Sequence, residues 1–106
     1  MTNATAINAA PEFFVSQWGY EQTNVCFYKV LKRTAKMVTL IKVQSRREYS
    51  DDVNYRAFPV DEVARGAEPI RRKLLNWGRG HETASISSYE TAFAWKGEHV
   101  YGSSGY

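Results

Sequence analysis

One cysteine and two histidines are the residues of this chain best suited to nucleophilic or metal chemistry. A catalytic Cys26 would need a nearby base, and only His81 and His99 could serve, both far away in sequence. Zinc sites usually show paired ligands a few residues apart, and the sequence contains no such pair. Cys26 lies between Val25 and Phe27, a setting typical of a small buried hydrophobe. We therefore expect no catalytic residue, no metal and no cofactor here.

Two pairs of neighbouring acids could supply the carboxylates of a general acid–base site. Asp51-Asp52 follows Ser50 in a segment typical of a turn, and Asp61-Glu62 suits the start of a helical turn. Adjacent residues of a strand point to opposite faces, so neither pair converges by itself. The sequence also lacks a phosphate-cradling glycine loop, a nucleophile elbow and a dinucleotide fingerprint. It therefore predicts a protein that is not an enzyme and that works by binding.

Basic side chains with aromatic neighbours form the most informative pattern. Nucleic-acid-binding sheets use cations to contact phosphates and aromatic rings to stack on bases. An ordinary small β protein offers the alternative interpretation, with cations on its solvated surface and aromatics in its core. The candidate binding residues are Trp18, Tyr20, Lys29, Lys32, Arg33, Lys36, Arg71, Arg72, Lys73, Trp77 and Arg79.

The distribution of charge is more informative than its total. The net charge is +3, which is modest for unaided binding to a polyanion. Residues 11–50 hold seven basic and three acidic side chains, residues 51–70 hold two and five, and residues 71–80 hold four and none. The chain thus has two basic segments separated by an acidic one. The sign of the charge argues against mimicry of DNA, because a mimic would be strongly acidic.

The chain of 106 residues is expected to form one domain. Residues 1–10 are expected to be a disordered tail, residues 11–101 a single β-rich domain and residues 102–106 a flexible tail. The single cysteine excludes an intrachain disulfide, and residues 1–10 resemble neither a signal peptide nor a membrane span. We therefore expect a cytoplasmic protein that does not contact membranes.

Strands are expected at 13–18, 25–33, 37–43, 55–60, 81–88 and 99–101, from aromatic and β-branched residues and turn signals. Residues 25–43 are expected to form a central hairpin. Its apolar positions predict a core that contains Phe27, Val30, Val38, Leu40 and Ile41. The mixed faces of residues 25–33 indicate a strongly bent antiparallel sheet.

We expect at most one short helix, and two segments are candidates for it. Residues 61–66 begin with two acids and end at a glycine, which suits one helical turn. Residues 69–77 fit a helix with Pro69 at its first position, or a strand that pairs with 81–88. Periodicity alone slightly favours the helix for 69–77.

The run from Ser16 to Tyr28, SQWGYEQTNVCFY, resembles small, largely uncharacterised phage, prophage and plasmid proteins that share S-x-W-G-Y-[DE]-Q-T-N-V-x-F-Y. The resemblance resumes at Ile86-Ser87-Ser88-Tyr89 and at Trp95-Lys96-Gly97-Glu98, where such proteins tend to have W-D-G-K/R-P. It implies an SH3-like or related barrel of five to six strands, with 69–77 as a strand. No catalytic residues are carried over.

The resemblance also implies an origin in a mobile element. Short proteins of such elements often occupy a surface on a larger machine, so the expected function is binding to a host protein or nucleoprotein complex. Inhibition of host defence, in the manner of an anti-CRISPR, is one form of this function. The alternative is a module that binds DNA or RNA directly through the two basic segments.

Overall fold

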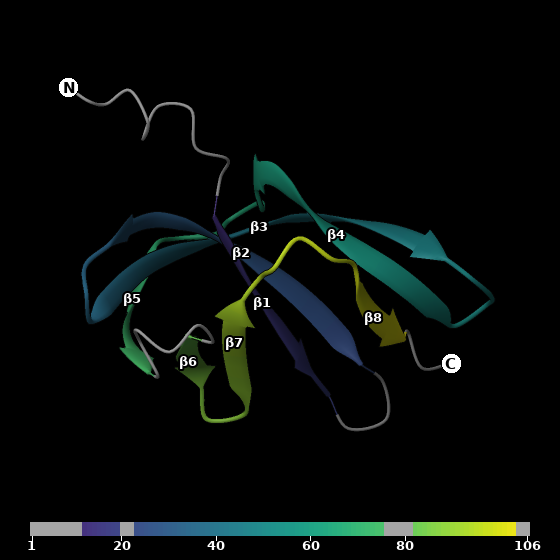
Figure 1. Ribbon diagram of the computed structural model, residues 1–106. Helices are drawn as coiled ribbons and strands as arrows, with labels where there is room; N and C mark the ends of the chain where they lie inside the picture. The colour runs from purple at the N-terminus through teal and green to yellow at the C-terminus, as the bar shows by residue number, and fades with distance from the viewer. Residues whose placement is uncertain (1–11, 20–22, 76–81, 104–106) are drawn as a thin grey trace.

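The computed structural model describes residues 12–19, 23–75 and 82–103, and every regular element in these ranges is a β-strand (Figure 1). The strands are β1 (Phe13–Trp18), β2 (Asn24–Arg33), β3 (Met37–Tyr49), β4 (Asn54–Val63), β5 (Ile70–Leu75), β6 (Thr83–Ser87), β7 (Glu90–Ala94) and β8 (Val100–Ser103). This confirms the predicted mainly β class.

Six of these strands close into an antiparallel barrel, as predicted. Around the barrel the order is β1, β7, β6, β5, β3 and β2, and the pairing of β2 with β1 completes the ring. The two further strands, β4 and β8, extend the sheet beyond the barrel (Figure 1). Strand β3 belongs to both parts, since residues 37–40 pair with β5 and residues 45–49 pair with β4. A register irregularity between Val43 and Ser45 marks the point where β3 leaves the barrel.

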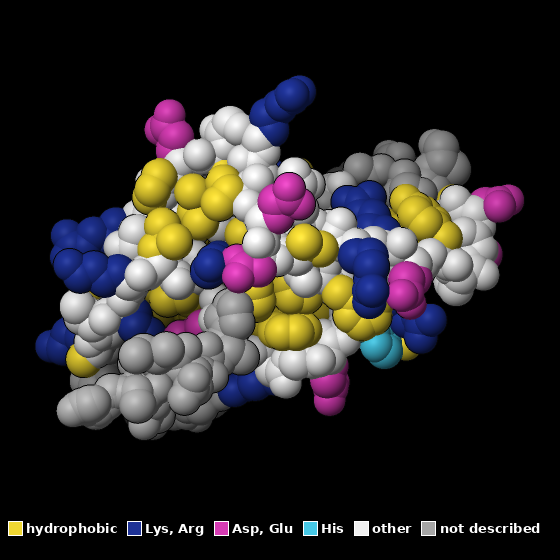
Figure 2. Space-filling view, turned by 90° about the horizontal axis from the view of Figure 1, so that it is seen from above, with side chains coloured by type: hydrophobic (Ala, Val, Ile, Leu, Met, Phe, Trp, Pro, Cys, Tyr) yellow, Lys and Arg dark blue, Asp and Glu magenta, His cyan; other side chains and the backbone are white. Residues whose placement is uncertain are grey.

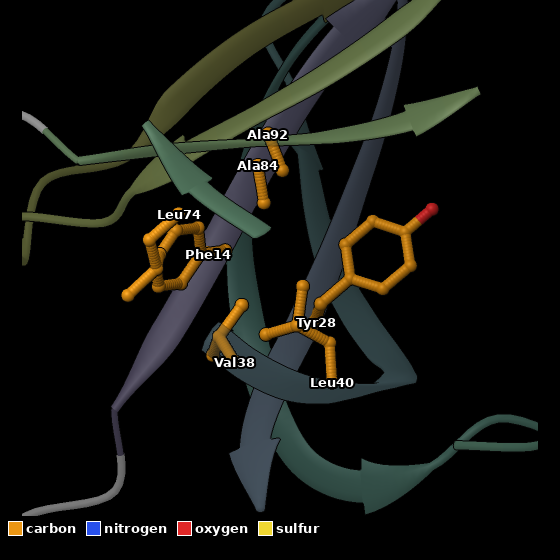
Figure 3. Close-up of a cluster of buried hydrophobic side chains, with 7 residues drawn as sticks. All are labelled: Phe14, Tyr28, Val38, Leu40, Leu74, Ala84 and Ala92. Atoms are coloured by element: carbon orange, nitrogen blue, oxygen red, sulfur yellow. The ribbon is translucent and has the colours of Figure 1, made fainter. Parts of the chain in front are cut away.

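All six barrel strands contribute to one core. Its members gather inside the barrel, with Tyr28 at the side of the cluster (Figure 3): they are Phe14, Tyr28, Val38, Leu40, Leu74, Ala84 and Ala92. Ala84 on β6 lies opposite Ala92 on β7. Such small side chains let the wall of a narrow barrel approach the large residues of the facing strands. The barrel interior is therefore packed and is not a channel.

A second core lies outside the barrel, on the opposite face of β1 and β2. Phe13 belongs to it while its neighbour Phe14 points inward, as strand alternation requires. Strands β4 and β8 cover this face, and the Trp95 ring meets Phe13 edge-on with the centroids 5.9 Å apart. The buried members are Phe13, Val25, Phe27, Val43, Tyr55 and Ala57. The two extra strands thus belong to the same folded unit as the barrel.

Gly102 fixes how closely β8 approaches this second core. A Cβ at this position would lie 2.5 Å from the Tyr55 ring, which is itself buried. We expect Gly102→Ala to lower the free energy of unfolding by about 1–3 kcal/mol, because the overpacked ring must move. Urea denaturation measures the loss. Gly66→Ala would be a poor control, because Gly66 has a φ of +76° and alanine at this position would strain the backbone. Thr91→Ala, at an exposed position of β7, is the control, and an equal loss there would contradict the packing argument.

Several sequence predictions are confirmed. Strand β1 has the expected bounds, and the hairpin at 25–43 is present as β2 and β3. Strand β3 continues to Tyr49, beyond the expected end at Val43. Of the predicted core residues, Phe27, Val38, Leu40 and Ile41 are buried, and Val30 is half-buried.

Other expectations need correction. The predicted helical turn at 61–66 is wrong: Asp61 and Glu62 lie in β4, and Gly66 lies in the turn that follows. Residues 70–75 form a strand, as the resemblance implies and against the slight preference of periodicity, while 76 and 77 lie outside the described residues. Strand β8 includes Gly102 and Ser103, which were expected to belong to the tail. Strand β7 was not predicted at all.

Candidate binding site

The structure brings the two basic segments together on the outer face of the barrel. Strand β3 lies between them: Thr39 pairs with Lys32 on one side and with Arg71 on the other. Met37 pairs with Lys73, so this cation also points outward, two residues along β5 from Arg71. Lys32, Arg71 and Lys73 are all exposed. We call this surface, together with the exposed Lys36 of the β2–β3 turn, the basic platform.

The basic platform lies at one end of the molecule. Figure 2 shows Lys and Arg side chains gathered at the left, the end that the β2–β3 hairpin occupies in Figure 1. A hollow of about 220 Å³ opens there, and its lining includes Lys32, Met37 and Arg71. The platform can therefore contact anionic groups through several cations at once.

Lys29 and Arg33 have carboxylate partners. The ammonium group of Lys29 lies 2.7 Å from a carboxylate oxygen of Asp61. The Arg33 guanidinium donates hydrogen bonds to Glu12 and to Glu82, the latter at 2.6 Å. The bond to Glu82 is the main cause that raises the pKa of Arg33 above its usual value, while partial burial opposes it. These ion pairs fix the edge of the platform and leave less positive charge for a ligand.

The remaining predicted residues lie elsewhere. Trp18 belongs to a different part of the barrel, where its indole N–H lies 3.5 Å from the Cys26 sulfur. Arg72 alternates with Arg71 and so points toward the barrel interior, where its guanidinium donates to the carbonyl of Ile86 at 3.2 Å. The last three, Tyr20, Trp77 and Arg79, lie outside the described residues.

Three further cations that line hollows were not selected from the sequence. Lys42, Arg47 and Arg65 line hollows between β3 and the connection from β4 to β5. A signal for Lys42 was present in the sequence, because it continues the inward row of Val38 and Leu40 with a charge. No comparable signal marks Arg65, since its place depends on how a loop crosses the barrel.

A buried carboxylate lies at the start of β7. Glu90 is only 7% exposed, and one of its oxygens accepts hydrogen bonds from the hydroxyl groups of Ser16 at 2.5 Å and Tyr28 at 2.7 Å. Burial is the first cause that raises the pKa of Tyr28 well above its usual value, and the bond to Glu90 is the second. Figure 3 shows the Tyr28 hydroxyl pointing away from the apolar core. The network joins β1, β2 and β7 across the inside of the barrel.

This network predicts how stability changes at alkaline pH. Because the folded state raises the pKa of Tyr28, the unfolded chain loses this proton first as pH rises above about 10. The contribution of Tyr28 to stability is therefore complete below that pH and falls by up to about 1.4 kcal/mol per pH unit above it. Tyr28→Phe should show a shallower decline in urea melts between about pH 9 and 11, whereas Tyr101→Phe, at an exposed tyrosine, should not. Equal slopes for wild type and Tyr28→Phe would contradict the prediction.

The residues first considered for nucleophilic or metal chemistry do not come together. Cys26 is partly buried beside the barrel core, and His99 stacks edge-on with Phe58 and Tyr101. His81 lies outside the described residues. Among residues 12–19, 23–75 and 82–103, no group of three potential ligands is placed to hold a metal ion. In the same ranges, no helix is long and apolar enough to cross a membrane.

Comparison of the chain with protein-family models, curated proteins and solved structures finds no match. Among the described residues, cations cluster on the basic platform of the outer face and around the hollows at Lys42 and Arg65.

Proposed function

We propose that this protein is a non-enzymatic binding module that docks on a nucleoprotein target through the basic platform. The observation that carries the proposal is the position of β3, which places Lys32 and Arg71 on either side of Thr39. Cations from two segments far apart in sequence thereby form one surface. Several cations on one rigid sheet can contact successive phosphates without a large cost of ordering.

Apolar side chains beside the platform favour a target that contains protein as well as nucleic acid. Leu75 continues the outward row of Arg71 and Lys73 on β5, and it is 48% exposed. Thr83 pairs with both Leu75 and Phe93, and Phe93 is 51% exposed. Exposed aromatic and aliphatic side chains next to cations are typical of surfaces that bind proteins. The modest net charge of +3 agrees with a mixed target.

The resemblance of residues 16–28 to proteins of mobile elements suggests the setting of this binding. In that setting the target is a host nucleoprotein complex, and the consequence of docking is inhibition of host defence, as anti-CRISPR proteins do. A basic module of this kind would contact the RNA or DNA of the complex together with an adjoining protein surface. It would not compete as a mimic of DNA, because its charge has the opposite sign.

A pull-down from bacterial lysate tests the proposal. The tagged chain should capture a complex whose yield falls after nuclease treatment, and Lys32→Gln/Arg71→Gln should capture at least tenfold less. Arg46→Gln/Arg56→Gln is the matched control, since both cations are exposed and lie in the β3–β4 hairpin. Capture that is unchanged in Lys32→Gln/Arg71→Gln would overturn the platform as the docking surface.

The second candidate is direct binding of free nucleic acid, which the same convergence of cations favours. The two candidates differ in what purified protein binds at physiological salt. Tight binding to random-sequence DNA or RNA supports the second, whereas weak binding to both and nuclease-sensitive capture from lysate support the first.

A further inference from the structure

A groove distinct from the basic platform runs across the barrel near the β4–β5 connection. It consists of two adjoining hollows of about 430 and 390 Å³. Both have the dimensions of small-molecule sites, which are commonly about 300–1,000 Å³. The linings share Lys42, Ala64 and Arg65, so these residues stand where the hollows meet. We call the two hollows together the barrel groove.

The barrel groove has an excess of positive charge. Among the described residues, its lining contains Lys42, Arg47, Arg65 and Arg72, against a single acid, Glu68. In the part of the chain that the structure describes, none of these four cations has a carboxylate within 4 Å. This distinguishes them from Lys29 and Arg33, whose charges are balanced by neighbouring acids.

Two of the four cations are held in place by groups that do not neutralise them. The Arg72 guanidinium donates to two backbone carbonyls, those of Arg71 at 2.9 Å and Ile86 at 3.2 Å. The Arg47 guanidinium lies over the Tyr55 ring, 4.4 Å from its centroid. Carbonyls and an aromatic face orient a cation while leaving its charge available to an anion. The groove is thus prepared to bind anionic groups.

The hollows also offer surfaces that suit a planar ring. The first contains Trp18, which is half-buried. Its ring packs edge-on against that of Tyr89, with the centroids 5.3 Å apart. Gln44 lies in the same lining and carries an amide group that can pair with polar ring edges. The second contains the half-buried Ile70 and Ile86. Each hollow therefore combines cations with an apolar or aromatic wall.

We propose that the barrel groove binds nucleotides, with a phosphate at Lys42 and Arg65 and a base in one or both hollows. Cations that contact the phosphate and side chains that contact the base are the two elements of single-strand recognition. The ligand is either a free nucleotide or a nucleotide unit of a single strand, and the two share this chemistry. The proposal is independent of the basic platform, because it uses different cations on a different face.

Titration calorimetry with three probes tests the proposal: inorganic phosphate, thymidine monophosphate and the dinucleotide pTpT. Both nucleotides should bind more tightly than phosphate, which lacks the base. A dinucleotide that binds at least tenfold better than the mononucleotide identifies a strand as the source, and equal affinities identify the free nucleotide. Absence of binding to either nucleotide at millimolar concentration, or equal affinity for phosphate alone, would overturn the proposal.

Matched variants locate the binding. Lys42→Gln/Arg65→Gln should weaken nucleotide binding at least tenfold and keep the wild-type stability, since both side chains are exposed. Arg46→Gln/Arg56→Gln in the β3–β4 hairpin removes the same charge from outside both proposed sites; it is the control and should change the affinity less than twofold. The nuclear magnetic resonance signal of the Trp18 indole N–H should shift on titration with pTpT. Equal losses in both double variants, or an unshifted Trp18 signal, would show general electrostatic attraction and contradict a site in the groove.

Discussion

Replacing Phe27 by alanine is expected to lower the free energy of unfolding by about 3–5 kcal/mol. The Phe27 side chain is completely buried, in the second core where β4 and β8 cover the barrel. Its ring meets Trp95 edge-on with the centroids 6.3 Å apart, so truncation removes an aromatic contact as well as apolar area. Urea denaturation at constant pH, followed by circular dichroism, measures the change.

Phe93 provides the control for this experiment. It also lies in a strand, but its side chain is 51% exposed on the outer face of β7. Phe93→Ala should therefore cost less than about 1 kcal/mol. If Phe27→Ala were equally mild, the second core would contribute little to folding, and β4 and β8 would not be part of one cooperative unit with the barrel.

Local composition was sufficient where a strand is largely buried. Residues 37–43 are rich in β-branched and apolar side chains, and this composition predicted β3 correctly up to Val43. Beyond Val43 the strand consists largely of polar and charged residues, because it pairs only with β4 in a hairpin that solvent reaches. Without a buried face there is no alternation to detect, and the sequence showed only the turn signal at Ser50-Asp51-Asp52.

Strand β7 shows the opposite difficulty. Its five residues have no distinctive period, and it begins with Glu90, a residue that is unfavourable in strands. Its conformation is fixed by pairing with β6 on one side and with β1 on the other, and β1 is distant in sequence. Glu90 is tolerated there because Ser16 and Tyr28 supply hydroxyl donors from β1 and β2. None of these partners can be inferred from the residues around β7.

The candidate site was predictable in composition but not in arrangement. The sequence identified both basic segments, but it did not show that they lie side by side. That arrangement depends on the register that pairs Thr39 of β3 with Arg71 of β5. The charge balance at Lys29 and Arg33 depends likewise on acids from other strands and loops. Ranking cations by their neighbours in sequence therefore placed compensated and uncompensated residues in one group. It also missed the barrel groove, whose cations come from separate segments.

Neutralising Lys32 and Arg71 together is expected to reduce the salt dependence of binding to random-sequence duplex DNA. Each cation that contacts a phosphate releases counterions, so loss of two contacts should flatten the slope of log affinity against log salt by up to about 1.8. The reason is specific to this structure: the two residues come from different basic segments and flank Thr39 in one row. Fluorescence anisotropy at several salt concentrations measures the slope for wild type, each single variant and the double variant.

Single and double variants distinguish phosphate contacts on one rigid surface from attraction by the overall charge of the protein. If Lys32 and Arg71 contact neighbouring phosphates from one rigid surface, each single variant should remove about half of the change in slope. Arg46→Gln/Arg56→Gln removes the same charge from the β3–β4 hairpin, where Glu48 already pairs with Arg56, and should leave the slope nearly unchanged. A slope that depends only on net charge, with both double variants alike, would mean that the protein attracts DNA through its overall field. In that case the row of Lys32, Thr39 and Arg71 would not be the surface that holds phosphates.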